Sequence, residues 1–127
     1  MKEKYTLEYL INSSLKILFP RLSTAIGLSE WFADDVKVED SIFIFRWKKQ
    51  KQQARMIKVK EQQNIRFQWL DEELHNEEYY FEFTVSQDEL TGVVTLTVTD
   101  FADSDEIEDS KNLWDTQIND LKRLLGS

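Results

Sequence analysis

The sequence of 127 residues lacks cysteine and has one proline, three glycines and a single histidine. Without cysteine it has no disulfide, no thiol nucleophile and no sulfur ligand for a metal, and one histidine cannot build a histidine-rich zinc site. So little proline and glycine excludes collagen and low-complexity disorder. We therefore expect no metal site and no cofactor.

Long apolar runs are also missing, since the longest span only a few residues, and the first residues, Met1 to Lys4, are charged. We therefore expect no signal peptide and no membrane-spanning helix, and we expect a cytoplasmic protein. A chain of this length can bury roughly two thirds of its unfolded surface around one core. Because no linker or repeat interrupts it, we predict one domain over residues 1–127.

Acidic residues outnumber basic ones by 24 to 16, which gives a net charge of -8. This charge repels phosphate, so we expect no nucleic-acid partner. The stretch 46–60 nevertheless holds seven cations and no acid. Lys48, Lys49 and Lys51 in this stretch are candidates for contact with an acidic protein, and simple solvation of an exposed hairpin is the alternative.

Two acidic stretches, residues 71–78 around His75 and residues 100–109, could suggest calcium. Neither has the alternating acidic pattern with a central glycine and a terminal glutamate that a calcium loop requires. We assign both to solubility and helix capping.

Alternation of apolar and polar residues at period two predicts strands through most of the chain. One face of each run is apolar and the other more polar, which is typical of an antiparallel sheet packed on one side. Short polar connections predict a meander. The predicted strands are Tyr5–Ile11, Val36–Val38, Ile42–Trp47, Ala54–Val59, Ile65–Leu70, Tyr79–Val85 and Val93–Val98.

Two short helices are expected between the first and second strands. Residues 12–14, Asn-Ser-Ser, offer N-cap side chains for the first, which Pro20 should end or kink. Ser23 is a candidate cap for the second, and Gly27 lies near its end.

The last segment predicts a long helix, because apolar residues recur there at steps of seven, four, three and four. Asp103 followed by Glu106 resembles a capping box at its start. The fold class is therefore α+β, a curved antiparallel sheet of six to seven strands wrapped around a long C-terminal helix. The helical stripe is Ile107, Trp114, Ile118, Leu121 and Leu125.

This element order, together with several local strings, resembles the START-like (helix-grip, SRPBCC) superfamily. The closer resemblance is to the bacterial branch that is similar to the C-terminal domain of the heat-shock-protein-90 ATPase activator. One departure is residues 39–41, Glu-Asp-Ser, where the family commonly has glycine. The matching strings are Asn-Ser-Ser at 12–14, Gly-Leu-Ser-Glu-Trp-Phe at 27–32, Arg-Phe-Gln-Trp at 66–69, the strand from Thr91-Gly92 to Phe101, and Trp114 with Leu121-Lys122.

The resemblance implies a binding fold whose members carry lipids, sense hormones, catalyse reactions or assist chaperones, so the fold alone selects no activity. Large rings dominate the expected inner face and form either an ordinary core or the lining of an apolar pocket. The pocket candidates are Trp31, Phe43, Phe45, Phe67, Trp69, Tyr79, Phe81, Phe83, Phe101, Trp114 and Ile118.

We expect no enzyme, because the predicted inner face is almost wholly apolar. Tyr9 and Tyr79 are its only expected hydroxyl-bearing rings, with no partner that would shift their pKa. The leading hypothesis is a binding module that holds a small hydrophobic or amphipathic molecule between the sheet and the last helix. The alternative is a chaperone-associated or other protein-interaction module without a ligand. A monomer and a weak homodimer are both compatible with the sequence.

Overall fold

The computed structural model describes residues 2–70 and 79–126. It confirms the predicted α+β class, with seven strands, two short helices after the first strand and a long last helix. The elements are β1 (Lys2–Ile11), α1 (Leu15–Ser23), α2 (Ala25–Ser29), β2 (Asp35–Glu39), β3 (Ile42–Trp47), β4 (Gln50–Lys60), β5 (Asn64–Trp69), β6 (Tyr80–Gln87), β7 (Val94–Asp103) and α3 (Ile107–Leu124).

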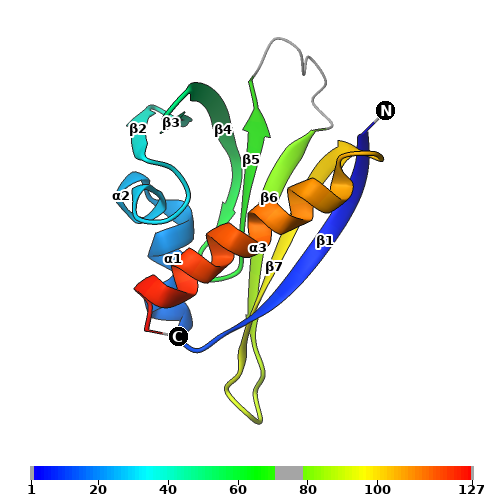
Figure 1. Cartoon of the computed structure of the whole chain (residues 1–127). Helices are drawn as coiled ribbons and strands as arrows, with labels where there is room; N and C mark the ends of the chain where they lie inside the picture. The colour runs from blue at the N-terminus through cyan, green and yellow to red at the C-terminus, as the bar shows by residue number, and fades with distance from the viewer. Residues whose placement is uncertain (1, 71–78, 127) are drawn as a thin grey trace.

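The strands form one antiparallel sheet in the order β1-β7-β6-β5-β4-β3-β2. Strands β2 to β7 are the predicted meander, and β1 pairs with β7 along its whole length, from Lys2 opposite Asp103 to Ile11 opposite Val94. The first and second strands therefore lie at opposite edges of the sheet. The segment with α1 and α2 carries the chain from one edge to the other (Figure 1).

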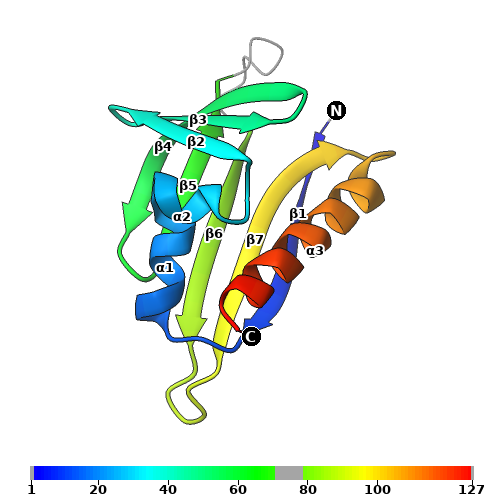
Figure 2. The ribbon, with the colours of Figure 1, turned by 60° about the vertical axis from the view of Figure 1, so that its left-hand side comes forward.

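All three helices lie on the same face of the curved sheet (Figure 2). Helix α3 contacts β7 and β1, α1 contacts β6, and α2 contacts β2. The register of β4 and β5 shifts between Met56 and Lys58, and such a bulge bends a strand and increases its twist. The bent β2–β3 end of the sheet runs across the top of the molecule in Figure 2.

Helix α3 forms because an apolar stripe can cover the inner face of the sheet. Trp114, Ile118 and Leu121 are buried, Glu108 and Asp109 lie in the first turn, and basic residues lie in the last turn. The helix begins at Ile107, and its N-cap residue, Glu106, makes no side-chain capping bond. The expected capping box is therefore not formed, and the Glu106 amide instead bonds to the Asp103 carbonyl at 2.8 Å in a turn.

Helix α1 starts as expected, since the Ser14 hydroxyl accepts from the Ile17 amide at 3.2 Å. Pro20 does not end it, because the helix continues to Ser23. Helix α2 is capped by Thr24 rather than Ser23: the Thr24 hydroxyl accepts from the Gly27 amide at 2.9 Å.

The turn between β2 and β3 differs from the glycine turn of the resembling family. Asp40 occupies it with a φ of 58°, in the left-handed region that aspartate tolerates better than most residues. The short polar side chain of aspartate thus replaces a glycine here.

Gly27 allows the backbones of the two short helices to approach each other closely. An added Cβ would lie 2.1 Å from the Pro20 carbonyl oxygen and 2.6 Å from the Arg21 Cα. Both neighbours are backbone atoms, which cannot move aside without separating α1 from α2.

We predict that Gly27→Ala lowers the free energy of unfolding by about 3 kcal/mol, because it overpacks a backbone contact. Denaturant unfolding measures the change. Ile26→Ala is the matched control, since Ile26 lies in the same helix with 78% of its surface exposed, and it should cost no more than about 0.5 kcal/mol. Equal stability of the two variants would contradict the close-approach argument.

Candidate functional site

An open hollow of about 260 Å³ lies between the sheet and the N-terminal half of α3. We call it the aromatic hollow, because Trp47, Trp69, Trp114 and Phe32 form much of its lining. Its other lining residues are Gln50, Gln52, Asp100, Ser110, Leu113 and Gln117.

The carbonyl oxygen of Phe32 holds three elements together beside this hollow. It accepts a hydrogen bond from the Trp47 indole nitrogen at 2.9 Å and from the Gln117 side-chain amide at 3.0 Å. Phe32 lies between α2 and β2, Trp47 ends β3, and Gln117 belongs to α3. One backbone atom therefore connects the α2–β2 segment, the sheet and the long helix.

The rings of the hollow are held by further rings behind them. Phe32 stacks on Trp114 with centroids 5.7 Å apart and meets Trp47 edge-on at 5.6 Å. Trp69 packs against Phe81 at 4.8 Å. Since Trp114, Phe32 and Phe81 are buried, the floor of the hollow is part of the core.

Asp100 places a carboxylate in the hollow. One of its oxygens, Oδ2, accepts from the Trp114 indole nitrogen at 2.8 Å and from the Tyr5 hydroxyl at 3.4 Å. The other, Oδ1, accepts from the Phe101 amide at 2.7 Å. Burial raises the pKa of the Asp100 carboxyl, and these hydrogen bonds and the charge of Lys2 oppose that rise.

Two tyrosines of β1 reach helix α3. The Tyr5 hydroxyl shares a hydrogen bond with Ser110, and the Tyr9 hydroxyl donates to Asp115 at 2.7 Å. Burial, followed by the neighbouring Asp100 carboxylate, raises the pKa of Tyr5 from 10.0 to about 12. Burial and the Asp115 bond also raise the pKa of Tyr9. Both phenols are thus kept neutral, which makes them poor general bases near neutral pH.

A second hollow of about 180 Å³ adjoins the first. Gln52, Trp69 and Asp100 line both, so these three side chains stand between the two spaces. The adjoining hollow is completed by Lys2, Tyr79, Tyr80 and Phe101.

The structure divides the eleven pocket candidates into three groups. Trp69, Tyr79, Phe101 and Trp114 line the two hollows described above. Trp31 lines a surface depression that shares Phe32, Trp47 and Gln117 with the aromatic hollow. Its indole nitrogen donates to the Arg21 carbonyl at 2.8 Å. The other six are buried in the core, where rings contact one another; they are Phe43, Phe45, Phe67, Phe81, Phe83 and Ile118.

Phe32 and Asp100 line the hollow and are not among these candidates. The sequence pattern assigns Asp100 to an acidic stretch for solubility and capping, and the structure instead places it in the hollow. The period-two pattern contains the signal for this position, because Leu96, Val98 and Asp100 follow one another on the inner face of β7. Phe32 ends the family-like string at 27–32, but it lies outside the period-two strands from which most of the candidates were chosen.

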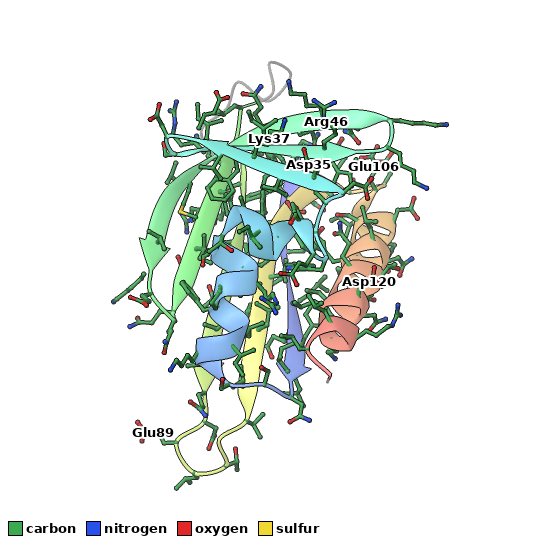
Figure 3. All side chains as sticks on the ribbon, turned by 90° about the vertical axis from the view of Figure 1, so that its left-hand side faces the viewer. Asp35, Lys37, Arg46, Glu89, Glu106 and Asp120 are labelled. Carbon is green, nitrogen blue, oxygen red and sulfur yellow. The ribbon has the colours of Figure 1, made fainter. Side chains whose placement is uncertain are left out.

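Lys48 and Lys49 lie on the turn that joins β3 to β4, and Lys51 lies on β4, all three exposed. Lys51 is directly opposite Arg46 in the β3–β4 ladder, and Asp35 flanks Arg46 on the other side (Figure 3). Within the described part of the chain, no ion pair includes any of these five side chains.

No group of three or more acidic or histidine side chains among residues 2–70 and 79–126 could hold a metal ion. His75 and the acidic stretch 71–78 lie outside the described residues. In the same described ranges, no helix is both long and apolar enough to cross a membrane.

The family model of the START-like superfamily domain matches residues 1–127. This chain belongs to the START-like superfamily. The resemblance seen in the local strings is thereby confirmed, and the helix-grip arrangement of sheet and α3 agrees with it.

Solved structures similar to this START-like chain include a Bacteroides fragilis protein with 44% identity, which covers 97% of this chain and 90% of that one with a TM-score of 0.68. The Aha1 dimer from Colwellia psychrerythraea has 17% identity, 97% and 96% coverage and a TM-score of 0.82. A Bacillus thuringiensis protein has 9% identity, 98% and 100% coverage and a TM-score of 0.81. The last two likenesses show the fold alone. No curated protein matches the chain.

We predict that Tyr5 makes the fold sensitive to high pH. Its pKa of about 12 in the folded chain exceeds the ordinary 10.0, so the folded state holds the phenolic proton more tightly. The corresponding stability is complete below pH 10 and is lost as the pH rises toward 12. In urea unfolding at several pH values, Tyr5→Phe should lose stability less steeply over this interval. An equal loss of unfolding free energy with pH in the unmutated chain and in Tyr5→Phe would contradict the assignment of this effect to Tyr5.

Proposed function

We propose that this START-like chain is a non-catalytic binding module that holds a small apolar or amphipathic molecule in the aromatic hollow. The observation that carries the proposal is an open space of about 260 Å³ walled by indole and phenyl rings between the sheet and α3. Ligand sites are concave and mostly apolar, with a few polar groups that orient the ligand.

The energetics favour a ligand with an apolar body. Each Å² of apolar surface that leaves water contributes about 25 cal/mol, and aromatic walls provide such surface.

The indole nitrogens of Trp47 and Trp114 already bond to protein oxygens. Gln50 and Gln52 line the hollow, and their side chains make no hydrogen bond within the described part of the chain. They are free to orient a polar end of the ligand.

The absence of catalysis is part of the proposal. A general base works best with a pKa near the working pH, whereas the pKa values of Tyr5 and Tyr9 are raised away from neutrality. Asp100 is engaged with Trp114, Tyr5 and the Phe101 amide. Its arrangement favours binding and orientation over proton transfer.

A second candidate function is contact with an acidic protein through the surface of β3 and β4. Arg46 and Lys51 face each other across the ladder, and like charges directly opposite destabilise a sheet. Asp35 lies opposite Arg46 on its other side and offsets part of this repulsion, and an acidic partner would compensate the rest. The likeness to the Aha1 dimer makes a second copy of this chain one such partner to test.

We predict that filling the hollow removes ligand binding. Gln52→Trp would place an indole in the space between the two hollows and should reduce binding of 1-aminoanthracene, a neutral fluorescent reporter, at least tenfold. Gln53→Trp is the matched control, because Gln53 is exposed and the adjacent residue on β4. Native mass spectrometry of gently purified protein should show the same difference for any co-purifying compound. Equal binding by both variants would contradict the proposal.

For the second candidate, we predict that replacing Lys48, Lys49 and Lys51 by Glu weakens capture of an acidic partner at least tenfold. Folding should survive, since the glutamate that replaces Lys51 would face Arg46 and form a favourable cross-strand pair worth about 0.2 to 1 kcal/mol. The control replaces Lys16, Lys111 and Lys122, which lie on α1 and α3, by Glu. Quantitative pull-down measures both, and unchanged capture by the first variant would count against this surface.

A further inference from the structure

We infer that the aromatic hollow is selective for an organic cation, a compound that carries a substituted ammonium group on a small apolar body. This inference rests on the proposed ligand-binding function and names the chemical class of the ligand. Three features of the hollow support it: an acid whose hydrogen-bond donors are all neutral, indole walls, and a lining free of positive charge.

The first feature is the state of Asp100. A carboxylate that is removed from water needs compensation by hydrogen bonds or an opposite charge. The three donors to Asp100 are neutral groups, namely the Trp114 indole, the Tyr5 hydroxyl and the Phe101 amide. No ion pair within residues 2–70 and 79–126 includes Asp100. Lys2, in the adjoining hollow, acts on Asp100 only through its charge and without an ion pair. A ligand cation in the aromatic hollow would therefore be the first positive group in direct contact with this carboxylate.

The second feature is the aromatic side chains that line the hollow. An ammonium group near the face of an aromatic ring is attracted by the ring's negative face, most strongly for tryptophan. Trp47, Trp69 and Trp114 all line the hollow, and Phe32 completes the aromatic lining. Such a set of rings around a carboxylate has the composition of a site for substituted ammonium groups.

The rings are held in place before any ligand binds. The indole of Trp114 donates to the Asp100 carboxylate itself, and the indole of Trp47 donates to the Phe32 carbonyl. Trp69 packs on the buried Phe81. Binding therefore orders few side chains, which reduces the entropic cost of association.

The third feature is the charge around the site. None of the ten lining residues is lysine, arginine or histidine. Lys48 and Lys49 are exposed on the nearby turn, where water and salt screen their charges within about 8 Å. Lys2 lines the adjoining hollow instead. The chain as a whole carries a charge of -8, which draws cations toward it.

The test compares choline with 3,3-dimethylbutan-1-ol, an alcohol of the same shape in which carbon replaces the ammonium nitrogen. Both are titrated into the full chain, and chemical shifts of the tryptophan indole N–H groups report binding at the hollow. We expect choline to bind at least tenfold more tightly, a difference of about 1.4 kcal/mol. Equal or tighter binding of the neutral alcohol, or no binding of choline, would overturn the inference.

Two variants separate charge from shape. Asp100→Asn should lower the affinity for choline at least tenfold and leave that for the neutral alcohol unchanged. Trp69→Leu should weaken choline binding by a similar factor, and Trp69→Phe, which keeps an aromatic face at the same position, should weaken it less. Circular dichroism and the dispersion of the amide spectrum show whether each variant folds. Unchanged choline affinity in folded Asp100→Asn and Trp69→Leu would overturn the inference.

The failure of this inference is distinguishable from failure of the proposed function. Suppose that 1-aminoanthracene binds, that Gln52→Trp abolishes its binding, and that choline binds no more tightly than the neutral alcohol. The hollow is then a ligand site, and the inference that it prefers cations is wrong. If neither the reporter nor the two matched compounds bind, both the proposed function and the inference are overturned.

Discussion

The structure depends on the contact between α3 and the inner face of the sheet. Under α3 that face carries the buried Phe81 and Phe83, whose rings contact Trp114 of the helix, and an uncovered surface of this kind would be unstable in water. A helix of 18 residues, about 27 Å long, covers it with Trp114, Ile118 and Leu121. Since Ser110, Leu113 and Gln117 of the same helix line the hollow, the element that closes the core also forms one wall of the candidate site.

Two polar connections determine the form of this wall. The Phe32 carbonyl bonds to Trp47 and Gln117, and the Asp100 carboxylate bonds to Trp114 and Tyr5. Hydrogen bonds to buried polar groups are costly to lose, because a group left without a partner has already given up its bonds to water. They therefore fix the positions of the indoles that face the hollow. A purely apolar interface would have more freedom to close the space by repacking.

Charge is segregated between the surface and the hollow. Exposed cations gather on β3, β4 and the turn between them, and the hollow contains a carboxylate and no cation among its lining residues. We propose different partners for the two features. The exposed surface can attract an acidic macromolecule from a distance, and the buried carboxylate acts only on a molecule small enough to enter.

Local periodicity predicted the seven strands and the long helix, because period-two and helical spacing reflect which face of each element is buried. Cap residues, Pro20 and Gly27 indicated the two short helices. Periodicity also identified Trp69, Tyr79 and Trp114 as ring residues of the inner region. It could not separate them from Phe67 or Phe81, since all are large rings at comparable positions. Whether a ring lines a hollow or is buried in the core depends on the curvature of the sheet, the bulge in β4 and the position of α3. Together these decide where side chains meet and where space is left. Asp100 became part of the site for the same reason: only the pairing of β7 with β1 and the approach of α3 bring its carboxylate to Tyr5 and Trp114.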